Sequence, residues 1–498
     1  MRKISTVLLS SLLFTMACGG GTNQPGGGGG AAGSAAGSGG SGQAGNAGRA
    51  GQAGSSAPAG QGGGGAGGAM GAAGRGGNAG GVAGGGGSAG GGGSVGGSSV
   101  GGSSAGGSSA GASGRGGAAA GAGAGGSNAG SGGAVGQAGS GGSTTTLTGF
   151  TCGAVGGKTM QQLFTEWYMR WSADHYVTCG TDMARIKGCT GDNNTCSEAI
   201  GYGMILTVAA GDQTAFDKLN RFRKALGAEY NKAYSSGGLM AWNSGDTCPP
   251  TAGGGNANNA PDGDLDAAMA LIQAGKKWPA GSYNADALAL IDAIWTKNVG
   301  TTAGKLYLGA GTSNLMDKSY VSYWSTGYFQ VFARFVTDPA KQTNWRNLAT
   351  RGLEMMKAVQ ADARCAGEFP ESVKIDGTIW DGDPCDFGYD SCRVPWRLAA
   401  DYAWFGTADS KTMLDLLRTG VVKGDPVASA RQKNSAFVGG LALSGVSADQ
   451  ATMNDFCTKW VNAKSAGSGY DDSPYFQKTL GVIYLLVAGG MFDRVVAP

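Results

Sequence analysis

Apolar residues recur at helical spacing through almost all of the chain beyond about residue 150. The segments that show this period lie near residues 158–176, 197–210, 213–230, 263–277, 284–297, 319–336, 341–361, 391–405, 409–421, 428–445, 448–464 and 473–491. Loops rich in Gly and Pro separate them. About a dozen helices joined in this way are typical of paired helices stacked around a ring. The pattern therefore predicts an all-α domain, an (α/α)6 barrel whose loops gather at one end.

The helix expected near 263–277 carries three carboxylates at its start. Leu265 and Met269 belong to its apolar face, while Asp262, Asp264 and Asp266 occupy the first turn and the loop before it. One Asp at a helix start is an ordinary N-cap. Three at alternate positions repel one another unless a cation, a proton or a substrate hydroxyl uses them. A calcium loop is disfavoured because the required Gly and Glu are missing. We therefore interpret the cluster as carboxylates that act on a substrate.

The first residues have the features of an export signal. Arg2 and Lys3 precede a short apolar run, 7–16, and the segment FTMAC ends at Cys18. The run is too short to span a bilayer, so we predict a signal peptide over residues 1–17. FTMAC resembles a bacterial lipoprotein cleavage site, which implies acylation of Cys18. We expect an exported protein, an outer-membrane or cell-surface lipoprotein, with plain secretion as the alternative.

Residues 18–147 consist almost wholly of Gly, Ala and Ser. Such a composition cannot bury a core, and it predicts a disordered low-complexity linker. A flexible coil of roughly 130 residues has an end-to-end distance on the order of 60 Å. We interpret this segment as a tether that gives the domain at 148–498 reach beyond a membrane surface.

Charge and histidine content narrow the chemistry of the domain. The net charge of +3, less the five basic residues before residue 148, leaves −2 for the remainder, which argues against a nucleic-acid partner. His175 is the only histidine, and the surrounding WSADHYV contains no nucleophile motif. Catalysis by Ser-His or Cys-His pairs would have to use it. We interpret His175 as structural, which leaves carboxylates as the main proton-transfer groups.

Nine cysteines lie beyond residue 150. In an exported chain most of them should form disulfides, and because nine is odd at least one thiol should stay free. The pairing cannot be read from the sequence. No C-x-x-C pair occurs, so a zinc site has little support.

Two further carboxylates stand in unusual contexts. Glu198 lies in TCSEAIGYGM, where Thr195 and Glu198 have capping-box spacing, yet Gly201 and Gly203 are costly inside a helix unless something approaches its backbone closely. Asp390 lies in FGYDSCRVPWR, where it could simply cap a helix and pair with a nearby arginine. Taken singly, each of the two carboxylates is better explained as structural.

Three segments together resemble a known family. SEAIGYGM, APDGDLDAAMALIQAGKKW and YDSCRVPWRLAADY, in this order, are similar to the sequence blocks of glycoside hydrolase family 8, whose members fold as (α/α)6 barrels. The resemblance covers about residues 155–491 and implies inverting hydrolysis of β-1,4-linked polysaccharides. It implies that Glu198 is the general acid, that Asp262 positions the sugar and the water, and that Asp390 is the general base.

The chemistry of inversion agrees with these roles. An acid must protonate the leaving oxygen while a base on the opposite face activates water, with the two carboxyls about 6.5–9.5 Å apart. We expect burial and the charge of Asp262 to raise the pKa of Glu198, and Arg393 to keep Asp390 ionised. The mechanism requires no metal or cofactor, although the acidic loop 380–384 is one place where we consider a cation.

Several aromatic residues are candidates to stack on sugar rings, although most Trp and Tyr in helical proteins are simply core. They are Trp242, Tyr320, Trp324, Tyr328, Trp380, Tyr389 and Tyr475, and Tyr202 could support the acid. Trp242 and Arg393 also resemble family substrate contacts. Cys392, two residues after the proposed base, is in a position that could join a disulfide with Cys385 or Cys365 and so hold that loop.

The first hypothesis is thus an endo-acting β-1,4-glucanase, a monomer that acts on cellulose or a related β-glucan. A xylanase or a chitosanase of the same family is the alternative among enzymes. Asp390 argues against the chitosanase branch, which resembles this pattern but takes its base from elsewhere. A non-catalytic polysaccharide-binding lipoprotein is the alternative outside enzymes, and the presence of all three carboxylates argues against it.

Overall fold

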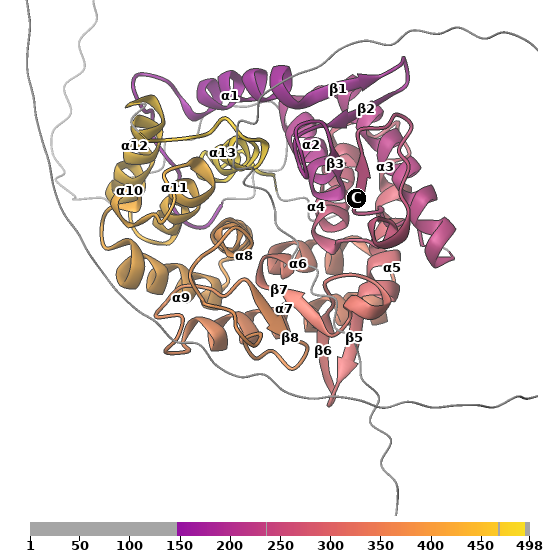
Figure 1. Ribbon diagram of the computed structural model, residues 1–498. Helices are drawn as coiled ribbons and strands as arrows, with labels where there is room; N and C mark the ends of the chain where they lie inside the picture. The colour runs from indigo at the N-terminus through magenta and orange to yellow at the C-terminus, as the bar shows by residue number, and fades with distance from the viewer. Residues whose placement is uncertain (1–146, 236, 467–468, 494–498) are drawn as a thin grey trace, which may run out of the picture. The chain divides into compact units, whose positions relative to one another are not determined.

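The computed structural model describes residues 147–235, 237–466 and 469–493 (Figure 1). The predicted signal peptide, Cys18 and almost all of the predicted linker lie outside the described residues. None of the helices within the described ranges has the length and apolar character needed to cross a bilayer.

An inner ring of helices forms the centre of the domain. Nearly all residues of these helices are buried, which explains why apolar and small residues occupy all sides of α2, α4 and α13. Most neighbours in the ring contact one another directly, α4 contacts the turn η3 that precedes α6, and α13 closes the ring against α2 (Figure 1). The inner helices are α2 (Ser197–Ala210), α4 (Pro261–Lys277), α6 (Thr326–Phe335), α8 (Val394–Phe405), α11 (Ser435–Ala442) and α13 (Tyr475–Ala488).

An outer layer alternates with the inner ring along the chain. Each outer helix packs on an inner one and buries one face, as α3 does with Phe216, Leu219 and Phe222. This alternation confirms the (α/α)6 barrel. The outer helices are α1 (Met160–His175), α3 (Gln213–Tyr234), α5 (Tyr283–Asn298), α7 (Pro339–Gln360), α9 (Ala408–Leu416) and α12 (Gln450–Ala466). Shorter helical pieces are α10 (Pro426–Ser429), η1 (Gly254–Ala257), η2 (Ser313–Leu315), η3 (Val321–Tyr323), η4 (Ser391–Arg393), η5 (Leu417–Val422) and η6 (Leu443–Ser447).

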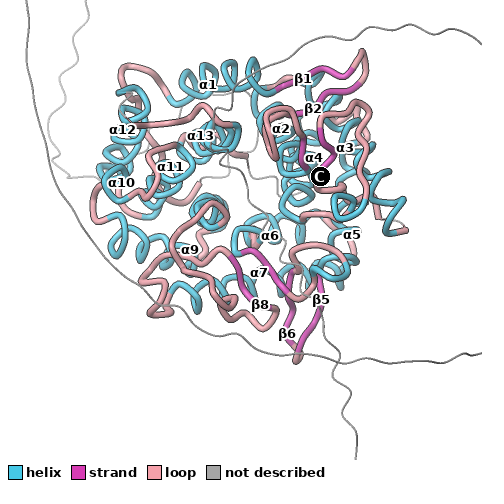
Figure 2. The backbone as a smooth tube through the Cα atoms, viewed as in Figure 1, coloured by secondary structure: helices cyan, strands magenta, loops and turns pink. Residues whose placement is uncertain are grey.

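Short antiparallel strand pairs lie in the segments between the helices, as Figure 2 shows. The pairs are β1 (Tyr176–Cys179) with β2 (Met183–Ile186), β3 (Thr195–Cys196) with β4 (Asn243–Gly245), β5 (Val299–Thr302) with β6 (Lys305–Leu308), and β7 (Lys318–Tyr320) with β8 (Ser372–Lys374). In β7–β8, Tyr320 lies opposite Ser372. Strands of two to four residues are too short to leave a period in the sequence, so the helical pattern did not predict them.

Most predicted helices agree with the structure to within a few residues, and two do not. The segment 319–336 begins with a strand and the turn η3, and its α-helix starts only at Thr326. The segment 428–445 is interrupted, because α11 begins at Ser435, where the Asn434 side chain caps it by accepting a hydrogen bond from the N–H of Phe437. In both places an apolar run continues through a turn that the period alone does not reveal.

The cysteines pair differently from the prediction at one point. Four disulfides join Cys152 to Cys457, Cys179 to Cys248, Cys189 to Cys196, and Cys365 to Cys385. Cys392 is the free thiol among the described residues, so the expected odd thiol is confirmed and the disulfide considered for Cys392 is wrong. Cys392 is buried in η4 with its Sγ 3.2 Å from the carbonyl oxygen of Tyr389. The Cys365–Cys385 disulfide instead closes the segment before that turn.

Candidate active site

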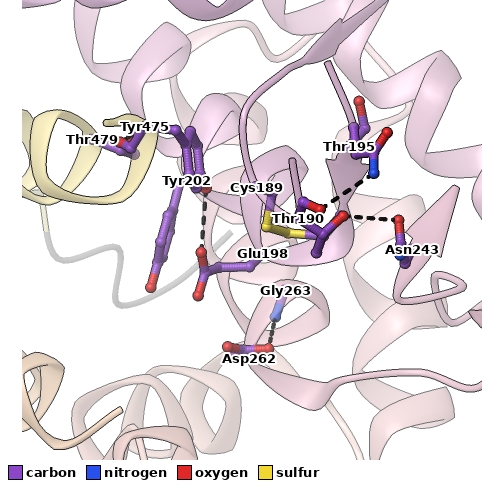
Figure 3. The surroundings of a disulfide bond; sticks show 12 residues. Cys189, Thr190, Thr195, Glu198, Tyr202, Asn243, Asp262, Gly263, Tyr475 and Thr479 are labelled. Atoms are coloured by element: carbon purple, nitrogen blue, oxygen red, sulfur yellow. Dashed lines mark hydrogen bonds between the residues drawn. A yellow bond between two sulfur atoms is a disulfide. The ribbon is translucent and has the colours of Figure 1, made fainter. Parts of the chain in front are cut away.

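Glu198 lies in the first turn of α2, directly after β3. The Ser197 N–H donates to the Trp242 carbonyl at 2.9 Å, which fixes the start of the helix against the β4 side. The capping box expected from Thr195 and Glu198 is not formed, because Cys196 is the N-cap and the Glu198 side chain turns toward α13 (Figure 3). There the Tyr475 hydroxyl donates to Glu198 Oε1 at 3.3 Å. The acid candidate is thus held on a helix, and only 5% of it is exposed.

Two glycines allow α2 and α4 to approach each other closely. A Cβ on Gly201 would lie 2.6 Å from the Gly263 carbonyl oxygen, and one on Gly263 would lie 2.4 Å from the carbonyl carbon of Ser197. The close approach that the glycines of α2 indicated is therefore made by another helix. It places Asp262, at the start of α4, beside Glu198.

Arg393 brings the three predicted carboxylates together. Its Nη1 donates to Glu198 Oε2 at 2.8 Å and to Asp262 Oδ2 at 2.7 Å, while its Nη2 donates to Asp390 Oδ1 at 2.5 Å. Nη1 also lies 3.4 Å from the Tyr202 hydroxyl. The guanidinium is almost completely buried. Residues separated by up to 195 positions in sequence therefore meet on one cation.

The other two acidic residues of α4 have separate partners. Asp266 pairs with Arg397 through two hydrogen bonds of 2.5 and 2.8 Å. Asp264 points away from that face and accepts from the Met240 N–H at 2.9 Å and from Asn259 at 3.2 Å. Residues four apart share a helix face, so Asp262 and Asp266 meet Arg393 and Arg397 as two parallel ion pairs. Among the three acidic residues of α4, Asp262 is the one that shares its partner, Arg393, with Glu198 in these contacts.

Burial sets the protonation of the acid candidate. Desolvation raises the pKa of Glu198 to about 8, against the lowering effect of Arg393 and with a further raising effect from Asp262. This confirms the expected shift and its causes. Burial also raises the pKa of Asp262, while Arg393 lowers it. At neutral pH Glu198 therefore carries the proton that a general acid needs.

The predicted sugar-binding residues separate into two groups. Tyr475 and Tyr202 contact the carboxylate cluster directly, through Glu198 and Arg393. Trp324 and Tyr328 lie in the core, and their predicted stacking role is wrong. Trp324 donates its indole N–H to the buried Ser319 hydroxyl at 2.9 Å. Rings of Phe332, Trp396, Trp404 and Phe492 surround Tyr328.

Of the remaining aromatic candidates, Trp242, Trp380 and Tyr389 are partly exposed, and Tyr320 is buried. Trp242 and Tyr389 are half-buried, and Tyr389 packs edge-on against Phe437 with ring centres 5.1 Å apart. Lys318 Nζ lies 4.6 Å from the Tyr320 ring centre and 5.3 Å from that of Trp380. Tyr320, Trp242, Trp380 and Tyr389 therefore stay candidates for sugar binding.

Glu371 and Tyr323 belong to the cluster and were missed. Both oxygens of Glu371 accept from the Asp390 N–H, at 3.2 and 3.3 Å. The Tyr323 ring centre lies 5.8 Å from Arg393 Cζ. Neither residue belongs to a spaced motif, since Glu371 precedes a three-residue strand and Tyr323 ends a single turn. The prediction of sugar-binding residues included Tyr320 and Trp324 from the same segment but not Tyr323.

Two other predictions can be compared with the structure. His175 is buried, its ring is edge-on to Tyr475 at 5.7 Å, and burial lowers its pKa to about 4, as a structural histidine requires. The acidic loop 380–384 uses its carboxylates internally. Asp381 pairs with Lys374, and Asp383 accepts from the N–H groups of Ser372 and Cys385 at 2.8 and 3.0 Å. This leaves the idea of a cation at that loop without support.

The family description "Glycosyl hydrolases family 8" matches residues 151–488, which is most of the chain. The chain belongs to glycosyl hydrolase family 8. It is therefore a glycoside hydrolase. Endoglucanase C of Ruminiclostridium cellulolyticum is 30% identical over 349 residues, which cover 66% of this chain and 71% of that protein. Beta-glucanase of Niallia circulans is 27% identical over 354 residues, 64% of this chain and 82% of that protein.

Solved structures share the barrel of this family 8 enzyme. The beta-1,3-1,4-glucanase from Paenibacillus sp. X4 superposes with a TM-score of 0.60 at 23% identity, over 70% of this chain and 98% of that one. A cold-adapted family 8 xylanase gives a TM-score of 0.57 at 18% identity, over 68% and 93%. At these identities the superpositions establish the fold.

Proposed function

We propose that this family 8 enzyme is an endo-acting hydrolase of β-1,4-glycosidic bonds in cellulose or a related β-glucan, and that it works with inversion. The observation that carries the proposal is that one guanidinium, Arg393, binds both Glu198, whose pKa burial raises to about 8, and Asp390. A single-displacement glycosidase needs one carboxyl that gives a proton and a second that accepts one. The names of the relatives, endoglucanases and a beta-glucanase, support the substrate class.

The proposed reaction is a single displacement at the anomeric carbon. Glu198 donates its proton to the glycosidic oxygen, and the bond from that oxygen to the anomeric carbon breaks with its electron pair on the oxygen. A water molecule attacks the anomeric carbon from the opposite face, and Asp390 accepts the proton that the water loses. Asp262 and Arg393 hold the sugar and the carboxyls in place. Solvent then returns a proton to Glu198 and removes one from Asp390.

Aromatic side chains are assigned to sugar binding in this proposal. Trp242, Trp380 and Tyr389 present partly exposed rings that are suited to the apolar faces of glucose units, and Tyr320 lies buried beside Lys318 and Trp380. Tyr475 instead orients the acid through its hydrogen bond to Glu198.

A xylanase is the second candidate, because family 8 xylanases share the fold. A chitosanase is disfavoured by Asp390, which supplies the base at its motif position. A non-catalytic binding protein is disfavoured because all three carboxylates meet on Arg393.

The proposal includes export and attachment to a membrane through Cys18, with residues 18–147 as a tether. Replacing Cys18 with Ala in cells should move the protein from the membrane fraction to the soluble exported fraction. If the protein stays on the membrane without Cys18, lipid attachment at this residue is wrong. We expect a monomer, which light scattering of the purified protein would test.

The experiment that tests the activity is reducing-sugar release by the full chain on carboxymethyl-cellulose, barley glucan, xylan and chitosan, with Asp390→Asn in parallel. Activity on the glucans that collapses in the variant supports the proposal. Preference for xylan supports the second candidate. A silent wild-type protein on all four substrates contradicts catalysis and favours the binding protein.

A further inference from the structure

Glu371 is fixed on the loop between α7 and α8, where no proposed catalytic role has been assigned. Its carbonyl accepts from the Val321 N–H at 3.1 Å, and its own N–H donates to Asp383 Oδ1 at 3.3 Å. The backbone is thus tied to η3 on one side and to the acidic loop on the other. Because both backbone groups are engaged, the Glu371 side chain starts from a fixed point.

The side chain of Glu371 is directed at Asp390. Its two oxygens accept from the Asp390 N–H, which places the Glu371 carboxyl beside the Asp390 residue whose charge acts on it. Gly388 leaves the space for this contact, since a Cβ there would lie only 1.7 Å from Glu371 Oε1. The backbone of Gly388 is outside the left-handed region, so this space, rather than its conformation, is what the glycine provides.

Two carboxyl groups can share a hydrogen bond only if one of them carries a proton. Of the two carboxyls, Asp390 is the one that accepts a hydrogen bond from the Arg393 guanidinium, at 2.5 Å. The proton belongs on Glu371. We propose that Glu371 is a positioning residue of this enzyme: as a neutral acid it donates a hydrogen bond to the Asp390 carboxylate, keeping that base ionised and aimed at the attacking water. This proposal rests on the proposed function.

The charges around Glu371 are consistent with a neutral side chain. Burial, together with the charge of Asp390, raises the pKa of Glu371 to about 8, against a lowering effect of Arg393. Arg431, from the loop before α11, faces Glu371 but is ion-paired with Asp386. The other titratable groups that face it are Asp383, which accepts its N–H, and the thiol of Cys392.

The test compares variants of the full chain on a β-glucan that the wild type hydrolyses. Glu371→Gln keeps a donor and an acceptor without a titratable proton, so we expect kcat within about threefold of wild type. Glu371→Leu removes both, and kcat should fall about 30- to 100-fold with KM little changed. Its acidic limb of kcat/KM should move to higher pH, since the ionised base loses a donor.

Two further variants keep the test decisive if Glu371→Leu folds poorly. Gly388→Ala displaces the Glu371 carboxyl without removing it, and should reproduce the loss of kcat. Glu368→Gln is the matched control, because Glu368 lies three residues away on the same segment and its carboxyl faces Asp386 and Arg431 instead. It should behave as wild type.

Two outcomes would overturn the proposal. If Glu371→Gln is as inactive as Asp390→Asn, Glu371 works as an ionised group. If Glu371→Leu and Gly388→Ala lower the Tm but leave kcat and its pH profile unchanged, the role is structural only.

A protein without activity would contradict the proposed function, but the protonation of Glu371 could still be tested by unfolding measurements. The folded pKa of Glu371 lies above its usual value, so its contribution to stability is lost as pH rises toward about 8. Between pH 5 and 8, the free energy of unfolding measured with urea should therefore fall less steeply in Glu371→Gln than in wild type. The difference between the two slopes should correspond to about one proton. Equal slopes would mean that Glu371 is ionised in the folded protein.

Discussion

The two sides of the carboxylate cluster are built differently. The side of the proposed acid consists of α2 and α4, whose backbones touch at Gly201 and Gly263 and hold Glu198 by helix packing. The side of the proposed base is the segment 361–393, which contains only the short strand β8 and the turn η4. Side-chain hydrogen bonds and the Cys365–Cys385 disulfide hold this segment.

This difference matches the needs of the two groups. A general acid must be kept neutral, which a tightly packed and desolvated helix start provides. A base must stay ionised and reach water, which requires hydrogen-bond and charge partners in place of dry packing. The comparison predicts that packing changes will damage the acid side most, and that changes in hydrogen bonding will damage the base side most.

The largest expected effect separates the two carboxylates by their chemistry. Glu198→Gln and Asp390→Asn should each lower kcat on polysaccharide by about 10³-fold. An aryl glycoside whose leaving group needs no protonation should restore much of the activity of Glu198→Gln and none of that of Asp390→Asn. Initial rates on both substrates check this. Recovery by the Asp390 variant instead would reverse the two assignments.

The next effect concerns packing. Gly263→Ala would place a methyl group against the Ser197 backbone, which cannot yield, so we expect a loss of about 3 kcal/mol or more in stability. Gly388→Ala meets only the end of the Glu371 side chain and should cost about 1 kcal/mol. Urea unfolding of both variants measures the difference. Equal losses would mean that the two sides are equally tightly packed.

Removing disulfides should separate stability from activity. Cys365 and Cys385 are 20 residues apart, and loss of their bond should cost about 3 kcal/mol and lower kcat, because the segment that carries Glu371 loosens. Cys189 and Cys196 are 7 apart, and the cost should be about 2 kcal/mol with kcat nearly unchanged, because α4 still holds Glu198. Unfolding and kinetic measurements on the two double Cys→Ser variants, one for each disulfide, check both expectations. A larger kcat loss at 189–196 would contradict the comparison.

The smallest effect is the pH dependence of the acid. Burial raises the pKa of Glu198 to about 8, so kcat/KM should fall about tenfold per unit as pH rises above that value. Stability should decline in the same direction, since a raised carboxyl pKa favours folding at low pH and loses this contribution as pH rises through about 8. A pH profile from 5 to 10 tests both. A flat profile to pH 10 would remove Glu198 from the acid role.

Much of the fold could be predicted from the sequence because the inner and outer helices carry a strong apolar period. Long inner helices such as α2 and α4 were located to within a few residues. The errors fell where chain geometry is local and short, at β7 with η3 and at the break before Ser435. Glu198, Asp262 and Asp390 were found because each lies in an ordered motif.

The sequence by itself determined the helical class and indicated the three carboxylates for which we propose catalytic roles, because helical period and residue type are properties of neighbouring positions. Only the tertiary structure decided which residues those carboxylates meet. Arg393 binds groups from three distant segments, Glu371 reaches Asp390 across 19 residues of irregular loop, and Trp324 and Tyr328 are buried in the core. Such contacts depend on how helices pack in the barrel, and packing between distant segments leaves no period in the sequence.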